Sequence, residues 1–463
     1  MTRQRHAGQD ISIKNNHYHK QGADRKHQVA KYGSEADKSG AEFYRRRIRK
    51  TAIFVDPKPE SFMINPNSPS LRLDSIDVFR AVTMFLMIFV NDLWSLEDVP
   101  GWLKHSQAAQ DAMGLSDVVF PGFLFIVGLS IPFAIANRQK KGDSNPLIVR
   151  HIAERTFALL LMGIFIVNYE NIAGDAMVIS KYVWEIGMVV AFFLIWNVYP
   201  SNPDRKGLYT GLKILGYLLL AALAAIYKGG DVENPSWMET HWYGILGLIG
   251  WSYLLGALTY VLTRDRLAWA IAGWLFFVLF NLADFAGALD FLDPVRKYVW
   301  IVGSGSMPAF VMAGVVASVI YRNSVSRDSV GSTYLIMLLV LGLICLAYGF
   351  GTRPFWGISK IRATPAWVGI CSGISFICFA FLFWLVDLKK IKTWANVIRP
   401  AGTATLTCYL IPYIWYAVIT LAGISLPMYL RTGLVGLAKS ACFSLLVIML
   451  TGAINRLGIK LKI

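Results

Sequence analysis

Apolar residues recur along the chain in long runs, each separated from the next by a short polar stretch. The runs begin near residue 76, and each is roughly 18–22 residues long, the length that a helix needs to cross a bilayer. Backbone groups inside lipid must form hydrogen bonds within the segment, so runs of this length are helices. The pattern predicts an all-α, polytopic integral membrane bundle of about twelve transmembrane helices. The expected spans lie near residues 76–96, 115–137, 147–168, 182–199, 208–227, 243–262, 267–287, 306–321, 331–350, 366–386, 398–422 and 433–454.

The first 70 residues differ in character from the rest. They are polar, and residues 1–62 contain 14 Lys and Arg residues against 7 Asp and Glu residues. Such a segment buries too little apolar surface to offset the entropy cost of ordering. We therefore expect a disordered basic tail over residues 1–70 and the membrane domain over residues 71–463. Met63, close to the first apolar run, is an alternative start of the chain.

Composition supports a membrane protein and argues against several other classes. The chain is 55% hydrophobic and 16% charged, whereas soluble domains are about one quarter charged. The net charge of +16 does not indicate nucleic-acid binding, because it is carried by the tail and by short loops next to membrane lipids. The five cysteines lie in apolar runs without a CxxC pair, so we expect no disulfide framework and no metal site. The sequence contains no phosphate-binding loop and no GxSxG motif.

Lys and Arg are unevenly distributed over the loops. Loops on the side of the N-terminal tail contain more of them than loops on the other side. Cytoplasmic loops carry this excess in membrane proteins. Both termini are therefore predicted to be cytoplasmic, and the loop between the first two spans is predicted to be external.

Polar side chains gather where the first two spans meet. The first span ends in Asn91 and Asp92, the following loop carries His105, and the second span opens with Asp117. Such groups are costly near lipid and are functional candidates by default. Each also has an ordinary structural explanation: an interfacial loop histidine, an amide that bonds between helices, or a carboxylate that complements a helix dipole.

A second candidate site lies in the external loop at residues 351–365, which is basic and aromatic. Cations suit carboxylate or sulfate groups, and aromatic rings stack on sugar faces. An interfacial aromatic belt is the structural alternative. The candidate acceptor-binding residues are Arg353, Trp356, Lys360 and Arg362, together with His241 in another external loop.

Residues 72–80, Arg-Leu-Asp-Ser-Ile-Asp-Val-Phe-Arg, resemble the R-x-x-S-x-D-x-F-R-G opening of the heparan-α-glucosaminide N-acetyltransferase family, with Ala81 in place of the glycine. The resemblance continues through residues 87–91, 104–106 and 115–130, and in weaker blocks to about residue 410. The family's large luminal N-terminal domain has no expected counterpart. Roughly two extra helices are expected around residues 243–287. Both departures leave the acceptor open.

The resemblance implies an integral-membrane acetyltransferase. Family members take acetyl from cytoplasmic acetyl-CoA and place it on an amino sugar or glycan across the membrane. His105 and Asn91 match the family's histidine and asparagine. A neutral imidazole can accept the proton of an attacking amine or carry the acetyl group itself, and both roles stay open. Asn91 would bind the developing oxyanion, and Asp117 or Asp92 would orient the imidazole.

Coenzyme A carries phosphates, which require cations on the cytoplasmic side. Arg80 and Arg155 lie one or two turns inside their helices and are the stronger candidates. Arg72, Arg150 and Arg399 lie at helix starts, where the cytoplasmic charge bias explains them equally well.

The alternative function is a transporter or flippase for a glycan or a lipid-linked precursor. It would require charged groups deep in the bundle, for which Asp284 and Glu185 are the acidic candidates, and related halves, which are not visible. We expect a multi-pass protein of a bacterial cytoplasmic membrane, although the family also allows a lysosomal membrane. Homodimerisation stays open.

Overall fold

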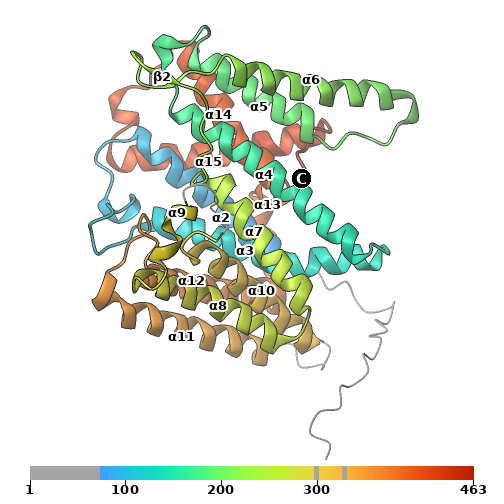
Figure 1. Ribbon diagram of the computed structural model, residues 1–463, viewed down its shortest axis with the longest axis vertical. Coiled ribbons are helices and arrows are strands. Elements are labelled where there is room, and N and C mark those ends of the chain that lie inside the picture. The colour runs from blue at the N-terminus through green and yellow to red at the C-terminus, as the bar shows by residue number, and fades with distance from the viewer. Residues whose placement is uncertain (1–72, 297–301, 326–330) are drawn as a thin grey trace, which may run out of the picture. The chain divides into compact units, whose positions relative to one another are not determined.

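The structure is a computed structural model that describes residues 73–296, 302–325 and 331–463. Helices dominate these residues and run side by side in layers (Figure 1). The predicted tail and Arg72 lie outside the described residues, so the expectations for them stay predictions.

Each of the twelve predicted spans contains a helix. The long helices are α2 (Asp74–Asp92), α3 (Leu115–Lys140), α4 (Asn145–Glu170), α5 (Lys181–Trp196), α6 (Lys206–Ala225), α7 (Ile245–Thr263), α8 (Leu267–Phe285), α10 (Ser306–Val325), α11 (Ser332–Trp356), α12 (Pro365–Leu382), α14 (Thr405–Leu421) and α15 (Gly433–Arg456).

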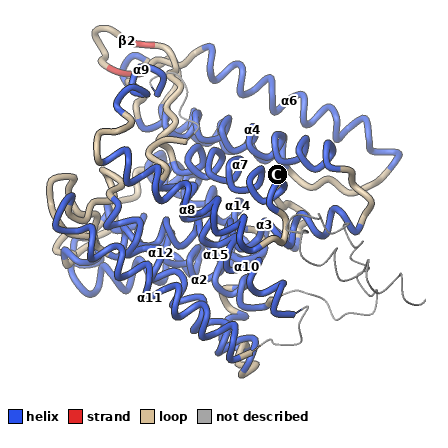
Figure 2. Tube along the Cα trace, turned by 60° about the horizontal axis from the view of Figure 1, so that its bottom comes forward, coloured by secondary structure: helices blue, strands red, loops and turns tan. Residues whose placement is uncertain are grey.

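Shorter elements connect them (Figure 2). They are the helices α9 (Asp293–Arg296) and α13 (Arg399–Thr403), a π-helical turn at Phe383–Leu388, the antiparallel strands β1 (Gly229–Gly230) and β2 (Pro235–Ser236), and 3-10 turns at Leu93–Ser95, Gly101–Leu103, Gly174–Ala176, Pro203–Arg205, Asp290–Leu292, Thr393–Asn396 and Met428–Leu430.

Within the described residues, nine helices are long and apolar enough to cross a membrane: α3, α4, α6, α7, α8, α10, α11, α12 and α15. The helix α14 is apolar but shorter, α5 has 16 residues, and the 19 residues of α2 include four charged ones. These findings confirm an all-α, multi-pass membrane protein. The count of twelve crossings and the cytoplasmic location of both termini stay predictions.

The backbones of α3 and α10 approach each other closely. A Cβ atom added to Gly128 would lie 1.8 Å from the carbonyl oxygen of Val311, and one added to Gly314 would lie 2.0 Å from that of Phe125. Small residues of this kind let helix backbones touch inside membranes. The contact fixes α3, whose first turn carries the candidate site, against the most buried helix of the bundle.

The start of α2 is held by a residue that lies more than 300 positions later in the sequence. Asp387, in the π-helical turn, accepts hydrogen bonds from the backbone N–H groups of Asp74 (3.1 Å) and Ser75 (3.2 Å). The first N–H groups of a helix have no partner within it, so this carboxylate serves as their cap. Arg80 lies less than two turns further along the same helix.

Candidate active site

His105 is held against the first turn of α3 by Asp117. Its Nδ1 lies 2.7 Å from Oδ1 of Asp117. The other carboxylate oxygen accepts the backbone N–H groups of Ser106 and Gly114, each at 3.0 Å. Asp117 is fully buried, whereas the side chain of His105 is half exposed. The carboxylate can only accept, so Nδ1 carries the hydrogen and Nε2 keeps a lone pair in the neutral ring.

Residues next to the start of α3 explain why the loop that carries His105 packs against this helix. Ser116 donates from its hydroxyl to the carbonyl oxygen of Leu103 at 2.5 Å. Gly114 faces the same segment so closely that a Cβ atom there would lie 2.0 Å from the carbonyl oxygen of Lys104. On the other side, the indole N–H of Trp367 donates to the carbonyl oxygen of Asp117 at 3.0 Å. The imidazole is therefore positioned by a helix start rather than by a mobile loop.

His105 opens onto a cavity of about 520 Å³, which we call the acceptor cavity after the predicted acceptor residues Lys360 and Arg362 on its wall. Asn91, at the end of α2, lines it together with Lys360 and Arg362 from the loop between α11 and α12. The structure thus brings together residues that the sequence predicted for two separate sites.

Lys360 lies beside the imidazole, with its Nζ 3.2 Å from Nδ1 of His105. Nδ1 cannot both donate to Asp117 and accept from Lys360, and the shorter contact assigns its hydrogen to Asp117. Burial lowers the pKa of Lys360, and the negative charge of Asp117 opposes that shift. Lys360 therefore places a positive charge on the wall of the cavity, and burying that charge costs desolvation free energy.

Asp92, the other predicted orienting carboxylate, faces away from the acceptor cavity. It accepts from Nζ of Lys439 at 2.7 Å and from the hydroxyls of Tyr416 and Ser440. It is 2% exposed and ties α2 to α14 and α15. Asp92 therefore supports the helix that carries Asn91 and does not contact His105.

Three of the predicted acceptor residues also lie off the cavity wall. Arg353 pairs with Asp111 at 2.9 Å, Trp356 packs on Phe285 with ring centroids 6.3 Å apart, and His241 lies 3.7 Å from Glu239.

The ion pair between Arg353 and Asp111 has a structural role. Oδ1 of Asp111 also accepts a hydrogen bond from the backbone N–H of Ile358 at 2.7 Å. That bond, and the bond from Arg353, lower the pKa of Asp111. The ion pair thus joins the loop of His105 to the loop of Lys360.

A second cavity, of about 380 Å³, lies near the start of α2. We call it the donor cavity because two residues that the sequence predicted as coenzyme A ligands, Arg80 and Arg155, line it. Arg80 donates to Oγ of Ser130 at 2.6 Å. The guanidinium of Arg155 lies 4.6 Å from the ring centroid of Tyr253, and its Nε is buried with no hydrogen-bond partner among the described residues.

The other predicted coenzyme A ligands are placed differently. Arg150 is exposed and pairs with Glu154 at 2.8 Å, and Arg399 begins α13 without lining the donor cavity. Sequence reasoning missed two further cations on the wall of this cavity, Lys460 and Lys462. Their only sequence signal was an alternation of Lys with apolar residues at the end of the chain.

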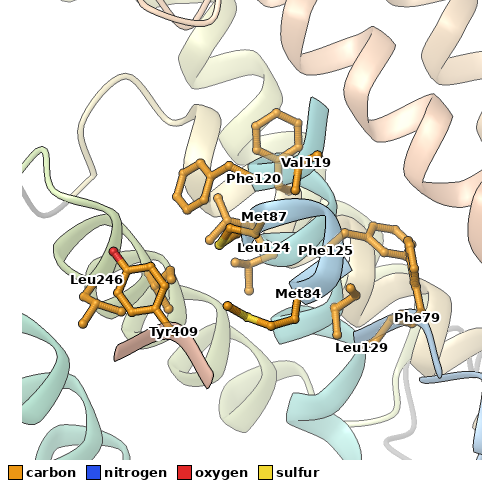
Figure 3. Close-up of a cluster of buried hydrophobic side chains, with 14 of the residues drawn as sticks. Phe79, Met84, Met87, Val119, Phe120, Leu124, Phe125, Leu129, Leu246 and Tyr409 are labelled. Atoms are coloured by element: carbon orange, nitrogen blue, oxygen red, sulfur yellow. The ribbon is translucent and has the colours of Figure 1, made fainter. Parts of the chain in front are cut away.

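The two cavities lie next to each other inside the bundle. Met87 and Ile245 line both of them, and Met87 is 4% exposed. Figure 3 shows Met84 and Met87 beside Phe120 and Leu124 of α3. Arg80 and Asn91 are 11 positions apart, so they lie about 16 Å apart along α2. The helix α2 thus runs from the donor cavity, where it carries Arg80, to the acceptor cavity, where it carries Asn91. The two cavities share the apolar side chains of Met87 and Ile245.

The described residues contain no cluster of three or more His, Cys, Asp or Glu side chains that could hold a metal ion.

Comparisons with known proteins agree with the motifs. Residues 72–199 match the family model described as heparan-alpha-glucosaminide N-acetyltransferase, catalytic. The Homo sapiens protein named heparan-alpha-glucosaminide N-acetyltransferase is 34% identical over 117 residues, which cover 24% of this chain and 16% of that protein. The Mus musculus protein of the same name is 29% identical over 167 residues, which cover 33% of this chain and 24% of that protein.

The matched segment contains Asn91, His105, Asp117 and both arginines of the donor cavity. The helices α7 and α8 and the loop of Lys360 lie outside it. The chain aligns with less than a quarter of the length of these relatives. Over residues 72–199 the chain resembles the catalytic region of heparan-alpha-glucosaminide N-acetyltransferases, which confirms the resemblance that its motifs indicate.

Proposed function

We propose that the protein is an acetyl-CoA-dependent transmembrane N-acetyltransferase that moves acetyl from the cytoplasmic side to an amino sugar or glycan on the external side. One observation carries the proposal. A histidine oriented by a buried carboxylate faces one cavity, and that cavity shares a wall with a second cavity lined by arginine and lysine. Location in a bacterial cytoplasmic membrane, with the donor cavity inside, belongs to the same proposal.

The donor cavity suits coenzyme A. Four cationic side chains line it: Arg80, Arg155, Lys460 and Lys462. Guanidinium groups bind phosphate oxygens through two parallel hydrogen bonds, and ammonium groups add point charges. Coenzyme A is large and polyanionic, so its phosphates stay in the donor cavity and only the thioester end has to reach past Met87.

In the acceptor cavity, the amine nitrogen of the sugar attacks the acetyl carbon, the new C–N bond forms, and the C–S bond breaks. Nε2 of His105 takes the proton from the amine and returns it to the leaving thiolate. Asp117 stabilises the imidazolium that forms, and the amide of Asn91 donates to the oxyanion. In the alternative course, Nε2 first takes the acetyl group from the thioester and then passes it to the amine.

The direct test is turnover by the purified protein. Acetyl-CoA is supplied with a panel of amino sugars, and thiol release and acetylated sugar are both measured. Thiol release that depends on the acceptor supports the proposal. No turnover and no binding of acetyl-CoA would contradict it.

A tryptophan at Met87 is expected to block the passage between the two cavities. The larger side chain would fill the apolar junction, and displacing reacting groups by about 1 Å can cost about 10²-fold in rate. We expect acetyl transfer to fall by about that factor, while acetyl-CoA still binds through the cations of the donor cavity. The measurement compares kcat for transfer with the dissociation constant of acetyl-CoA.

Met449→Trp is the matched control, because Met449 is 58% exposed on α15, away from either cavity. If Met87→Trp transfers acetyl as fast as the control, acetyl does not pass this junction.

Alanine at Gly114 is expected to displace the loop of His105. The added Cβ would meet the carbonyl oxygen of Lys104 at 2.0 Å, so the backbone next to the histidine must shift. We expect a loss of about 10²-fold in kcat with the helical content retained. The control is Gly101→Ala in the same loop, where no atom lies within 4 Å of the added Cβ. Equal activity of the two variants would show that the position of this loop is not critical.

The transporter alternative retains one supporting observation, the two cavities at opposite ends of α2 that a thin apolar wall separates. It predicts that a sugar crosses a sealed vesicle without being acetylated. Transport of unmodified sugar with no thiol release would favour it.

A further inference from the structure

The acceptor cavity has a second set of polar residues, which α7, α8 and α9 contribute. Trp251, Asp284 and Arg296 line the cavity together with the rings of Tyr243 and Phe285. All of them lie outside residues 72–199, the segment that matches the catalytic model. The acetyl-transfer chemistry described above uses none of these side chains.

Trp251 presents a buried donor without a partner. Its indole Nε1 is buried and has no hydrogen-bond partner among the described residues. The ring of Trp242 packs edge-on against it, with centroids 5.6 Å apart. Buried polar atoms are nearly always paired. Because Trp251 also lines the acceptor cavity, a molecule bound there can supply the missing partner, whereas Trp274, whose Nε1 is likewise unpaired among the described residues, does not line that cavity.

Asp284 presents an acceptor in the same cavity. Arg296 donates to its Oδ1, and no described residue donates to its Oδ2. The Asp284 side chain is 12% exposed, close to the end of an apolar helix. A carboxylate at such a place is costly, and here one of its oxygens is left for a ligand.

An indole N–H, a carboxylate oxygen and aromatic faces together suit a hydroxylated ring. Sugar hydroxyls both donate and accept, and the C–H face of a pyranose packs on aromatic rings. Sites of this kind combine an apolar lining with a few placed polar groups.

We propose that Trp251 and Asp284 bind hydroxyl groups of the acceptor sugar and thereby determine which sugar is acetylated. This inference rests on the proposed function, because it assigns the acceptor to the cavity of His105. The helices α7 and α8, which lie outside the matched segment, then supply acceptor selection, while the segment that resembles the family supplies the chemistry.

The test measures binding of glucosamine and its 3-, 4- and 6-deoxy analogues to the purified full-length protein, without acetyl-CoA. Trp251→Phe keeps the ring and removes the N–H, so we expect glucosamine to bind about 3- to 10-fold more weakly. Asp284→Asn keeps the shape and removes the charge, and we expect a loss of about 10-fold or more. For one deoxy analogue, wild type and the Trp251 variant should bind equally, because the bonded hydroxyl is absent from the ligand.

Trp274→Phe is the matched control. Its Nε1 is likewise buried without a partner among the described residues, but Trp274 does not line the acceptor cavity. That variant should bind every analogue as wild type does.

The readout separates this inference from the proposed function. If wild type transfers acetyl and both cavity variants bind glucosamine as wild type does, the inference is overturned while the function stands. If wild type binds glucosamine, loses it in the Trp251 variant and transfers no acetyl, the inference holds and the function fails. If wild type binds no sugar, the inference is overturned.

Discussion

His105→Ala is expected to lower acetyl transfer by about 10²–10⁴-fold, the contribution that a positioned general acid–base group makes. The loss follows because nothing else at the same place can take the amine proton. Lys360 is a cation on the Nδ1 side of the ring, and Asp117 is fully buried and does not line the acceptor cavity. The measurement is kcat for acetylated sugar, together with the affinity for acetyl-CoA, which should not change.

His151→Ala is the control for this variant. His151 lies on α4, with its Nδ1 3.2 Å from Glu154, and lines neither cavity. Full activity of His105→Ala would place the catalytic base elsewhere.

The same experiment distinguishes the two roles left open for His105. As an acetyl carrier, the imidazole should release about one equivalent of thiol per protein in the absence of acceptor. As a base, it should release none until the amine is present. Either result leaves the histidine in the reaction.

Arg155→Gln is expected to raise KM for acetyl-CoA by about 10–100-fold with little change in kcat, since a hydrogen bond to a charged group contributes about 1.5–3 kcal/mol. Arg155 lines the donor cavity, and no described residue accepts a hydrogen bond from its guanidinium, which lies over the ring of Tyr253. A phosphate group in the cavity would supply an acceptor for the guanidinium. An interaction made equally in the ground state and the transition state changes KM alone.

Arg150→Gln is the matched control, one and a half turns away on the same helix. Arg150 is exposed and pairs with Glu154, so its loss should leave KM unchanged. Equal effects of the two substitutions would mean that general surface charge, not the donor cavity, attracts acetyl-CoA.

The fold could be predicted largely from apolar run length. Every predicted span contains a helix, because an apolar run of about 20 residues satisfies its backbone hydrogen bonds in lipid only as a helix. The predicted span at 398–422 is divided into α13 and α14, which meet at Ala404. The sequence carried a sign of this division, because Pro400 and Gly402 both disfavour a continuous helix there.

Contacts within the candidate site could be predicted where the two residues lie close together in the sequence. His105 and Asp117 are 12 positions apart, and a helix start joins them. Asn91 and Asp92 are neighbours, but successive helix residues point about 100° apart, so one lines the acceptor cavity while the other faces inward. The partner of Asp92, Lys439, is 347 positions away, and no local pattern shows such a contact.

The same limit applies to the cations. Arg150 and Arg155 are five positions apart, which places them about 140° apart around α4, on different faces. The helical periodicity predicts that the two arginines lie on different faces of α4. It does not show which of these faces lines a cavity. Arg353 looked available for an acceptor until folding placed Asp111 beside it. Asp284 was an acidic candidate from its apolar surroundings in the sequence. Its ion pair with Arg296 could not be predicted, because it depends on the path of the loop between α8 and α9.

The most direct test of transmembrane transfer uses sealed proteoliposomes, with acetyl-CoA supplied on one side and glucosamine on the other. The account predicts N-acetylglucosamine in the compartment that contains no acetyl-CoA, with wild type but not with His105→Ala. Acetylated sugar that forms only when both substrates share one compartment would contradict it.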